Sequence, residues 1–133
     1  MGRSSVRQIG LLLLLLLAQP ALAFEYALSY EQECSYKGPS FECKNSTQRA
    51  TIRQRPDGKW VGINQRGREI ELDVMKQDDY LLVLNNPVYF SGSSLIHIMK
   101  KTGRFYWSEF AYSEVLKADE GHVSVGRVSL STE

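Results

Sequence analysis

The segment from Leu95 to Tyr112 constrains the fold more than any other part of the chain. It contains two runs of β-branched and aromatic residues around Lys101-Thr102-Gly103. Such residues favour a pleated sheet, and a glycine can adopt the positive φ that tight hairpin loops require. The segment therefore predicts a β-hairpin.

A two-residue loop at Thr102-Gly103 would set the register of this hairpin. It would place Ile98 opposite Trp107 and His97 opposite Ser108. Apolar side chains then occur on both faces of the hairpin. Because such a strand pair needs cover on each side, we expect a second sheet, a barrel closure, a ligand or a partner against it.

The N-terminal residues predict a secretory signal peptide over residues 1–23. Arg3 and Arg7 precede the apolar run Leu11–Leu17, and Ala21-Leu22-Ala23 has the small residues of a cleavage site. The run is shorter than the about 20 residues of a membrane-spanning helix. We expect an exported, soluble protein, periplasmic or extracellular, in which residues 24–133 form a single β domain.

Removal of the first 23 residues leaves 110 residues with a net charge of −1. The basic residues between Arg53 and Arg68 are followed at once by Glu69, Glu71 and Asp73. Mixed charges of this kind are typical of solvated strand faces. We therefore expect no nucleic-acid partner and no membrane span, and we expect a monomer.

The two cysteines, Cys34 and Cys43, are expected to form a disulfide in an oxidising compartment. The only histidines, His97 and His122, lie far from them in the sequence, and no Cys-x-x-Cys occurs. No metal site and no cofactor are therefore expected. Asn45-Ser46-Thr47 is a glycosylation sequon whose use depends on the organism.

Alternating or continuous apolar runs between turn residues predict further strands. Phe24 to Tyr30 alternates with period two, Tyr80 to Leu84 reads as a strand buried on both faces, and His122 to Leu130 as a final strand. Ser113 to Gly121 predicts one or two helical turns capped by its end residues.

Residues 50–74 predict three strands around Pro56-Asp57-Gly58 and Arg66-Gly67. With a two-residue loop at Arg66-Gly67, one buried face is shared by Val61, Ile63, Ile70 and Leu72.

The preceding turn gives two possible registers. A three-residue loop at Pro56-Asp57-Gly58 places Arg53 opposite Val61, whereas the hydrophobic match places Ile52 opposite Ile63. A β-bulge would reconcile the two.

These elements predict an all-β fold, a small antiparallel meander that forms a closed or partly open barrel of about eight strands. A two-sheet β-sandwich is the alternative. At most one short helix, near residues 113–121, is expected.

Catalytic chemistry is not expected, because no nucleophile with a base, paired carboxylates or metal set stands out. His97 beside Ser108 lacks a positioned acid. Glu109 would share a face with Ile96 and Trp107, either as an edge residue or as the anchor of a ligand.

The many aromatic residues of the hairpin and its surroundings can be core or can form a binding surface. The candidate residues for binding a ligand or partner are Ser91, Ser93, Ser94, Tyr106, Trp107 and Glu109.

Export, small size, one disulfide and Ser91-Gly92-Ser93-Ser94 before an aromatic hairpin resemble the C-type lysozyme inhibitors. In that family a Ser-Gly loop followed by Tyr enters the lysozyme cleft, supported by a Lys-Gly segment. Lys101-Thr102-Gly103 approximates the second segment, whereas Leu95 stands after Ser94 and the loop contains no Tyr. The resemblance implies a periplasmic inhibitor.

The sequence therefore predicts a non-catalytic binding module whose partner is an unknown protein or a small apolar ligand. The alternatives are an inhibitor that resembles the C-type lysozyme inhibitors and a carrier of a small apolar ligand.

Overall fold

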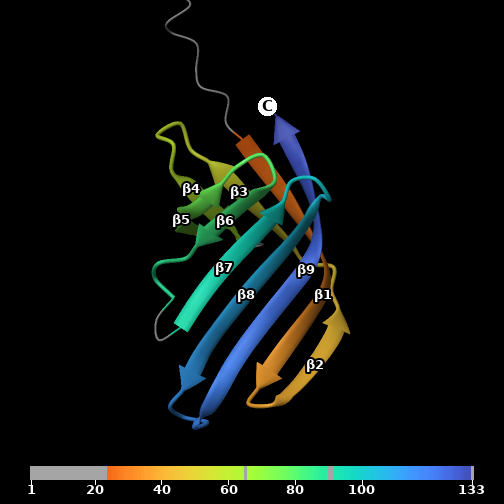
Figure 1. Ribbon diagram of the computed structural model, residues 1–133, viewed down its shortest axis with the longest axis vertical. Helices are drawn as coiled ribbons and strands as arrows, with labels where there is room; N and C mark the ends of the chain where they lie inside the picture. Colours follow the sequence, from red (N-terminus) through yellow and green to blue (C-terminus); the bar gives the residue numbers. More distant parts are fainter. Residues whose placement is uncertain (1–23, 65, 90–91, 133) are drawn as a thin grey trace, which may run out of the picture.

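The computed structural model describes residues 24–64, 66–89 and 92–132. The expected signal peptide and Ser91 lie outside these residues. The described part is built from strands (Figure 1), and it contains no helix that is long and apolar enough to cross a membrane. The strands are β1 (Phe24–Lys37), β2 (Ser40–Asn45), β3 (Arg49–Gln54), β4 (Trp60–Ile63), β5 (Glu69–Gln77), β6 (Leu81–Asn85), β7 (Gly92–Met99), β8 (Arg104–Ser113) and β9 (Ala118–Thr132).

Eight of the strands form a closed antiparallel barrel. Their order is β1-β3-β4-β5-β6-β7-β8-β9, and pairing of β9 with β1 closes the sheet. The extra strand, β2, pairs with β1 beyond the segment where β3 pairs with it. The predicted all-β barrel is confirmed, in preference to the two-sheet sandwich.

A β-bulge in β1 changes which of its side chains face the barrel interior. The register against β9 shifts between Tyr30 and Gln32, so Glu31 is an extra residue. Such a bulge interrupts the alternation of side chains along a strand. As a result, Leu28 before the bulge and Glu33 after it lie on the same side of the sheet.

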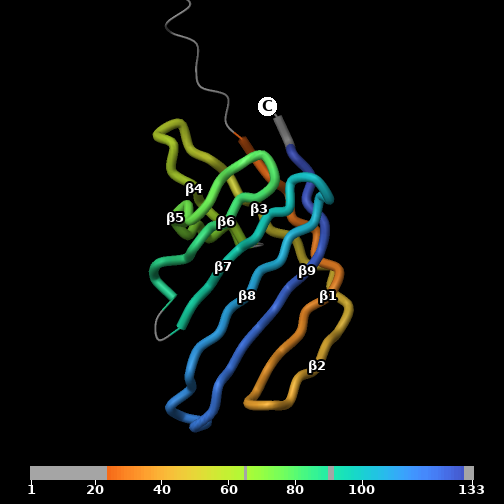
Figure 2. The backbone as a smooth tube through the Cα atoms, viewed as in Figure 1, coloured from red at the N-terminus to blue at the C-terminus, as the bar shows by residue number. Residues whose placement is uncertain are grey.

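Beyond this bulge the long strands continue past the barrel as a sheet extension, seen at the bottom of Figure 2. The sheet extension comprises β2, residues 32–37 of β1, residues 118–125 of β9 and residues 108–113 of β8. Its inner face continues the barrel interior, and its outer face is the opposite one. Directly paired residues share a face, so rows of side chains cross the sheet.

The barrel centre is filled by apolar side chains. Tyr26 and Trp60 stack with ring centroids 5.9 Å apart beside this core. Burial of so much apolar surface is the main stabilising term of the fold. The core side chains that are at most 1% exposed are Leu28, Ile52, Leu82, Leu84, Ile96, Ile98 and Phe105.

The hairpin predicted at Leu95 to Tyr112 is formed by β7 and β8, but its predicted register is wrong. The loop has four residues, Lys100 to Gly103, and Ile98 faces Phe105 rather than Trp107. The N–H of Gly103 donates a hydrogen bond to the carbonyl of Met99, 2.9 Å away, and this bond closes the four-residue loop. Because the register differs by two residues, each side chain keeps its predicted face.

At the turn between β3 and β4, turn chemistry predicts the register correctly. Arg53 lies opposite Val61, as expected from a loop at Pro56-Asp57-Gly58. Gly58 has a φ of 88°, and the Asp57 carboxylate accepts the N–H of Lys59 at 3.0 Å. The alternative register from hydrophobic matching is wrong.

The predicted two-residue loop at Arg66-Gly67 is also wrong. The carboxamide oxygen of Asn64 accepts the N–H groups of Arg66 and Arg68, each at 3.0 Å, and stabilises a longer loop. Leu72 consequently pairs with Trp60 instead of sharing a face with Val61. Val61 is buried on the outer side of the barrel, and the inner face holds Trp60, Ile70 and Leu72.

The helical turns predicted for Ser113 to Gly121 are absent. β8 and β9 are joined instead by a turn over residues 114–117, in which Lys117 has a φ of 52°. The Ser113 hydroxyl accepts the N–H of Leu116 at 3.2 Å, so Ser113 caps a turn rather than a helix. The long strand β9 takes up the remaining residues because each of them finds a partner on β8 or β1.

Candidate functional site

The open end of the barrel next to the sheet extension contains a cavity of about 320 Å³. Its lining includes two aromatic residues, two amide residues and two arginines, of which Arg49 pairs with Ser29 and so directs its side chain to the outer face of β3. The lining residues are Tyr30, Gln48, Arg49, Ala50, Asn64, Arg66 and Trp107.

The two aromatic residues of the cavity, Tyr30 and Trp107, are fixed in position by contacts with buried residues. The ring of Tyr30 packs against Phe105, with centroids 5.1 Å apart, and Phe105 is fully buried. The indole N–H of Trp107 donates a hydrogen bond to the hydroxyl of Ser94 at 3.1 Å. Because Ser94 is only 1% exposed, this bond fixes the orientation of the Trp107 ring.

Next to this cavity, the inner face of the sheet extension is polar. Three rows of paired side chains cross it, in place of the apolar rows of the barrel. They are Trp107-Ser124-Glu33-Lys44, Glu109-His122-Ser35-Glu42 and Ala111-Glu120-Lys37-Ser40.

Glu109 is a half-buried carboxylate on this face. It lies between Ser94 of β7 and His122 of β9 in the ladder. Among the described residues it makes no side-chain hydrogen bond and no ion pair within 4.0 Å. Burial raises the pKa of Glu109, and the charge of His122 opposes this rise only in part.

Burial and the negative charges of this face raise the pKa values of two phenols, those of Tyr30 and Tyr89. Burial, followed by the negative charges of Glu33 and Glu109, raises the pKa of Tyr30 far above its usual range. Burial also raises the pKa of Tyr89, as do the charges of Glu109 and Glu120. Both phenols therefore stay neutral and can donate hydrogen bonds at physiological pH.

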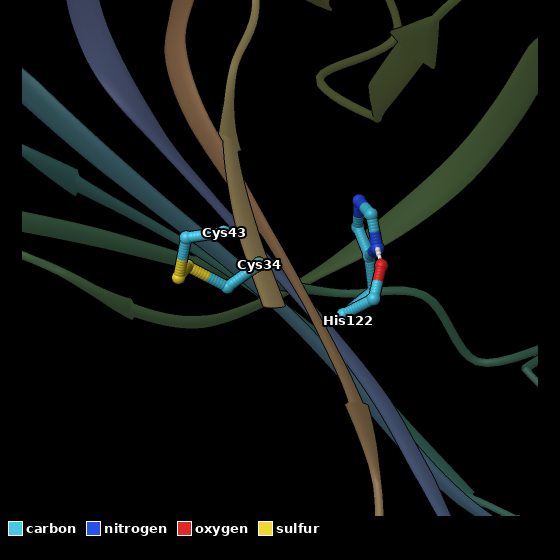
Figure 3. Close-up of a disulfide and its surroundings, with 4 residues drawn as sticks. Cys34, Cys43 and His122 are labelled. Carbon is cyan, nitrogen blue, oxygen red and sulfur yellow. Dashed lines mark hydrogen bonds between the residues drawn. A yellow bond between two sulfur atoms is a disulfide. The ribbon is translucent and has the colours of Figure 1, made fainter. Parts of the chain in front are cut away.

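His122 lies between Glu33 and Ser35 on the inner face. Its Nε2 lies 3.2 Å from the Glu33 carboxylate, and its Nδ1 lies 3.4 Å from the Ser35 hydroxyl. Figure 3 shows His122 on one side of the strands and the Cys34–Cys43 disulfide on the other. The predicted disulfide is thus confirmed, and it lies on the outer face.

Glu33 is held in its charged form. Its burial would raise the pKa, but hydrogen bonds from Ser46 and His122 and the charges of His122 and Lys44 outweigh burial and lower the pKa. Glu33 is 6% exposed. A buried carboxylate with such partners is an organising element of the site.

The Ser35, His122 and Glu33 side chains match a serine hydrolase in residue type but not in surroundings. Catalysis of acyl transfer needs N–H groups aimed at the oxygen that becomes negative. Ser35 lies in the middle of a sheet, paired with Glu42 on one side and His122 on the other. Ser35 thus lies between two paired strands, and His122 contacts the Glu33 carboxylate through Nε2.

The structure brings together only part of the predicted site. Ser94, Trp107 and Glu109 meet on the inner face. Ser93 and Tyr106 point to the outer face, away from the cavity, and Ser91 lies outside the described residues. His97 also belongs to the outer face, where it pairs with Tyr106 rather than with Ser108.

Several residues of the site were not predicted from the sequence. Among them, Glu33 reaches the inner face only because of the bulge at Glu31, which precedes it in β1. Arg66 belongs to the mixed charges that the sequence predicts on solvated strand faces, and no role is predicted for Arg49. Both arginines lie next to strand ends in the sequence. Because the ends of barrel strands surround the mouth of the barrel, this position could have indicated that they lie near it.

The outer face of the sheet extension is aromatic. The ring of Tyr36 stacks on Phe41 at 5.4 Å and contacts Phe110 at 5.8 Å between centroids. Phe41 is 62% exposed, and Tyr112 on the same face is 48% exposed. The aromatic set predicted from the sequence is thus divided between a packed core and an exposed surface.

The two segments that resemble the C-type lysozyme inhibitors lie far apart. Gly92 to Ser94 begins β7, whereas Lys101 to Gly103 follows its end. Six residues, 95–100, lie between the segments and separate them by roughly 20 Å at about 3.3 Å per residue. The geometry gives no support to a single surface built from both.

Comparisons of the chain with protein-family models, curated proteins and solved structures gave no match. The function must therefore be inferred from the geometry and chemistry of the open end of the barrel.

Proposed function

We propose that this protein is a non-catalytic binding module that holds a small polar ligand at the open end of its barrel. The observation that carries the proposal is Glu109, a half-buried carboxylate without a side-chain hydrogen bond or ion pair among the described residues, which lies two residues along β8 from the cavity residue Trp107 and on the same face. A carboxylate in this state destabilises the fold at neutral pH, because its charged form is poorly solvated. Residues of this kind are typical of binding sites, where a ligand supplies the missing partner.

The chemistry of the cavity favours a ligand with a ring and with charges of both signs. Tyr30 and Trp107 offer aromatic surface to the flat face of a ring. Arg66 suits an anionic group, since guanidinium groups bind carboxylate and phosphate in a bidentate manner. Glu109 suits a cationic group or a hydrogen-bond donor.

The size of the cavity limits the ligand. Its volume of about 320 Å³ lies at the small end of ligand pockets, so we expect a ligand of the size of one phosphorylated or carboxylated sugar. The other two functions expected from the sequence have less support. A carrier of an apolar ligand needs an interior that the core side chains Leu28, Ile96 and Phe105 already fill. A lysozyme inhibitor of the C-type kind needs Gly92 to Ser94 and Lys101 to Gly103, which lie at opposite ends of β7, to act together.

Export remains part of the proposal. The Cys34–Cys43 disulfide is typical of an oxidising compartment, and the expected cleavage site after Ala23 directly precedes β1. The mass of the protein purified from its own host tests this. We expect a chain that starts at Phe24, and a mass that includes residues 1–23 would contradict export by cleavage.

The ligand class is tested with three probes of the same ring. Glucosamine 6-phosphate carries an ammonium and a phosphate, glucose 6-phosphate lacks the ammonium, and glucosamine lacks the phosphate. Binding is followed by Trp107 fluorescence in a Trp60→Phe background, because Trp60 is only 2% exposed in the core. We expect the first probe to bind most tightly.

Two variants show which side chain contacts the ammonium and which contacts the phosphate of the probe. Glu109→Gln should weaken binding of glucosamine 6-phosphate and leave glucose 6-phosphate unchanged, whereas Arg66→Ala should weaken both. Tyr106→Ala, on the outer face of the same strand, is the matched control and should change neither. Absence of binding by all three probes, or equal binding by the Glu109→Gln variant, would contradict the proposed ligand class.

A further inference from the structure

The outer edge of β2 is a free sheet edge. Within the described residues, β2 pairs with β1 alone, and all six of its residues are exposed. Figure 1 shows β2 at the margin of the sheet extension, with no strand beyond it. Its interior contains neither a proline nor a bulge, the usual devices that prevent an edge from pairing.

The pairing with β1 fixes which backbone groups of β2 point outward. Cys34 and Cys43 lie opposite each other with their Cα atoms 4.0 Å apart, the close spacing of a non-hydrogen-bonded pair. In such a pair the N–H and C=O groups point away from the partner strand. The groups of Cys43, and by alternation those of Phe41 and Asn45, therefore point to the free edge.

We propose that this edge pairs with the same edge of a second copy of the protein, antiparallel and with Cys43 opposite Cys43 of the second copy. The outward N–H and C=O groups of the two edges then meet directly. Phe41 lies opposite Asn45 of the second copy, so each of these pairs exchanges hydrogen bonds. The four strands of each sheet extension become one continuous sheet.

Charge selects this register over its neighbours. Glu42 and Lys44 flank Cys43 on the inner face, and no ion pair involves either residue within the described chain. With Cys43 on the two-fold axis, each Glu42 faces Lys44 of the other copy, in two closely spaced opposite-charge pairs. A shift by two residues in either direction places Glu42 opposite Glu42, or Lys44 opposite Lys44, which destabilises the pairing.

Glu42 and Lys44 also explain why the edge of β2 does not pair with any strand that it meets. A charged residue on an edge strand opposes pairing with most other strands. The alternation of Glu42 and Lys44 is complementary only to a strand with the inverse order, which an antiparallel copy of β2 supplies. The Cys34–Cys43 disulfide holds the edge in place, so little order is lost on pairing.

The interface is small, because each copy contributes one six-residue strand. Interfaces of this size give weak, concentration-dependent association. The dimer is therefore expected to appear as protein concentration rises, and sedimentation equilibrium over a concentration series of the mature chain measures it.

Charge exchange provides the decisive test. Glu42→Lys alone and Lys44→Glu alone each convert both opposite-charge pairs into like-charge pairs, so each should weaken the dimer by about tenfold or more. A mixture of the two variants restores opposite charges across the interface and should form a heterodimer. The double exchange Glu42→Lys with Lys44→Glu should restore the homodimer.

Controls separate folding from association. Circular dichroism and the melting temperature of each variant, taken at low concentration, establish that the barrel is intact. Phe110→Ala, on the outer face but away from the edge, should leave the dimer unchanged. A wild-type protein that stays monomeric over the whole series, or single variants that dimerise as the wild type does, would overturn the proposal.

Discussion

The rings of Tyr36 and Phe110 meet over Gly121 on the outer face of the sheet, with centroids 5.8 Å apart. The same arrangement occurs on the inner face, where Tyr30 and Phe105 meet over a glycine of β9, with centroids 5.1 Å apart. The bulge in β1 places the two clusters on opposite faces. The same arrangement, in which a tyrosine of β1 meets a phenylalanine of β8 over a glycine of β9, thus occurs twice, once in the core and once on the surface.

The two glycines predict unequal sensitivity to a methyl group. A Cβ at Gly126 would overlap the carbonyl of Ser29 and approach the buried ring of Phe105, whereas a Cβ at Gly121 would overlap only the half-exposed ring of Phe110. A backbone carbonyl cannot move aside, but a surface ring can. Gly126→Ala should therefore cost about 1–3 kcal/mol or more of unfolding free energy.

Gly121→Ala should cost clearly less than Gly126→Ala, since the Phe110 ring can rotate away from Tyr36. Urea denaturation of both variants measures the difference. Equal losses of stability would mean that the outer cluster is as rigid as the core.

Glu109 predicts a gain of stability on neutralisation. Burial raises the pKa of Glu109, so its contribution to stability is present at low pH and is lost as pH rises through the folded pKa. Glu109→Gln removes this loss, and its melting temperature should exceed that of the wild type at neutral pH by up to a few degrees. The difference should shrink as the pH falls through the raised pKa of the folded protein, because the wild-type carboxyl then becomes protonated.

Glu109→Asp is the control for this effect, because it keeps the charge in nearly the same place. It should not reproduce the gain at neutral pH. A Glu109→Gln variant that is less stable than the wild type at neutral pH would show that the carboxylate has a partner that stabilises it.

The sequence permits the fold to be predicted where local chemistry decides it. Strand alternation, the disulfide and the turn at Pro56-Asp57-Gly58 all depend on neighbouring residues, and the register of Arg53 and Val61 follows from that turn. Hydrophobic matching alone gives the wrong answer there. Gly67 and Gly103 also have positive φ, yet their loops are longer than the two residues predicted, so a turn glycine marks a turn without fixing its length.

Features that depend on distant partners could not be predicted. In the loop from Lys100 to Gly103, the carbonyl of Gly103 accepts the N–H of Val128, a residue of β9, at 2.8 Å. The bulge at Glu31 is visible only in the pairing with β9. Since this bulge decides that Glu33 faces His122, the polar inner face could not be predicted either.

Glu33 predicts acid sensitivity. The hydrogen bonds from Ser46 and His122 lower its pKa despite its burial, so it stabilises the fold above its unfolded pKa, and this contribution is lost as pH falls through the folded pKa. Glu33→Gln should cost about 1–3 kcal/mol at neutral pH, as expected for hydrogen bonds to a charged group. The free energies of the wild type and the variant should converge in acid.

The sign of this effect is opposite to that of Glu109, although both carboxylates face His122. Unfolding free energies of the two glutamine variants, measured in parallel from neutral to acidic pH, therefore distinguish the structural carboxylate from the ligand carboxylate. Parallel curves for the two variants would contradict the division of roles.

The disulfide predicts local stabilisation of the sheet extension. Cys34 and Cys43 close a short loop, for which the loop-entropy estimate gives on the order of 2–3 kcal/mol. Reduction should therefore lower the melting temperature by several degrees. The barrel core contains neither cysteine, so amide exchange should rise mainly in β2 and residues 32–37 of β1, while β6 and β7 stay protected. Uniform loss of protection over all strands would show instead that the sheet extension and the barrel unfold as one unit.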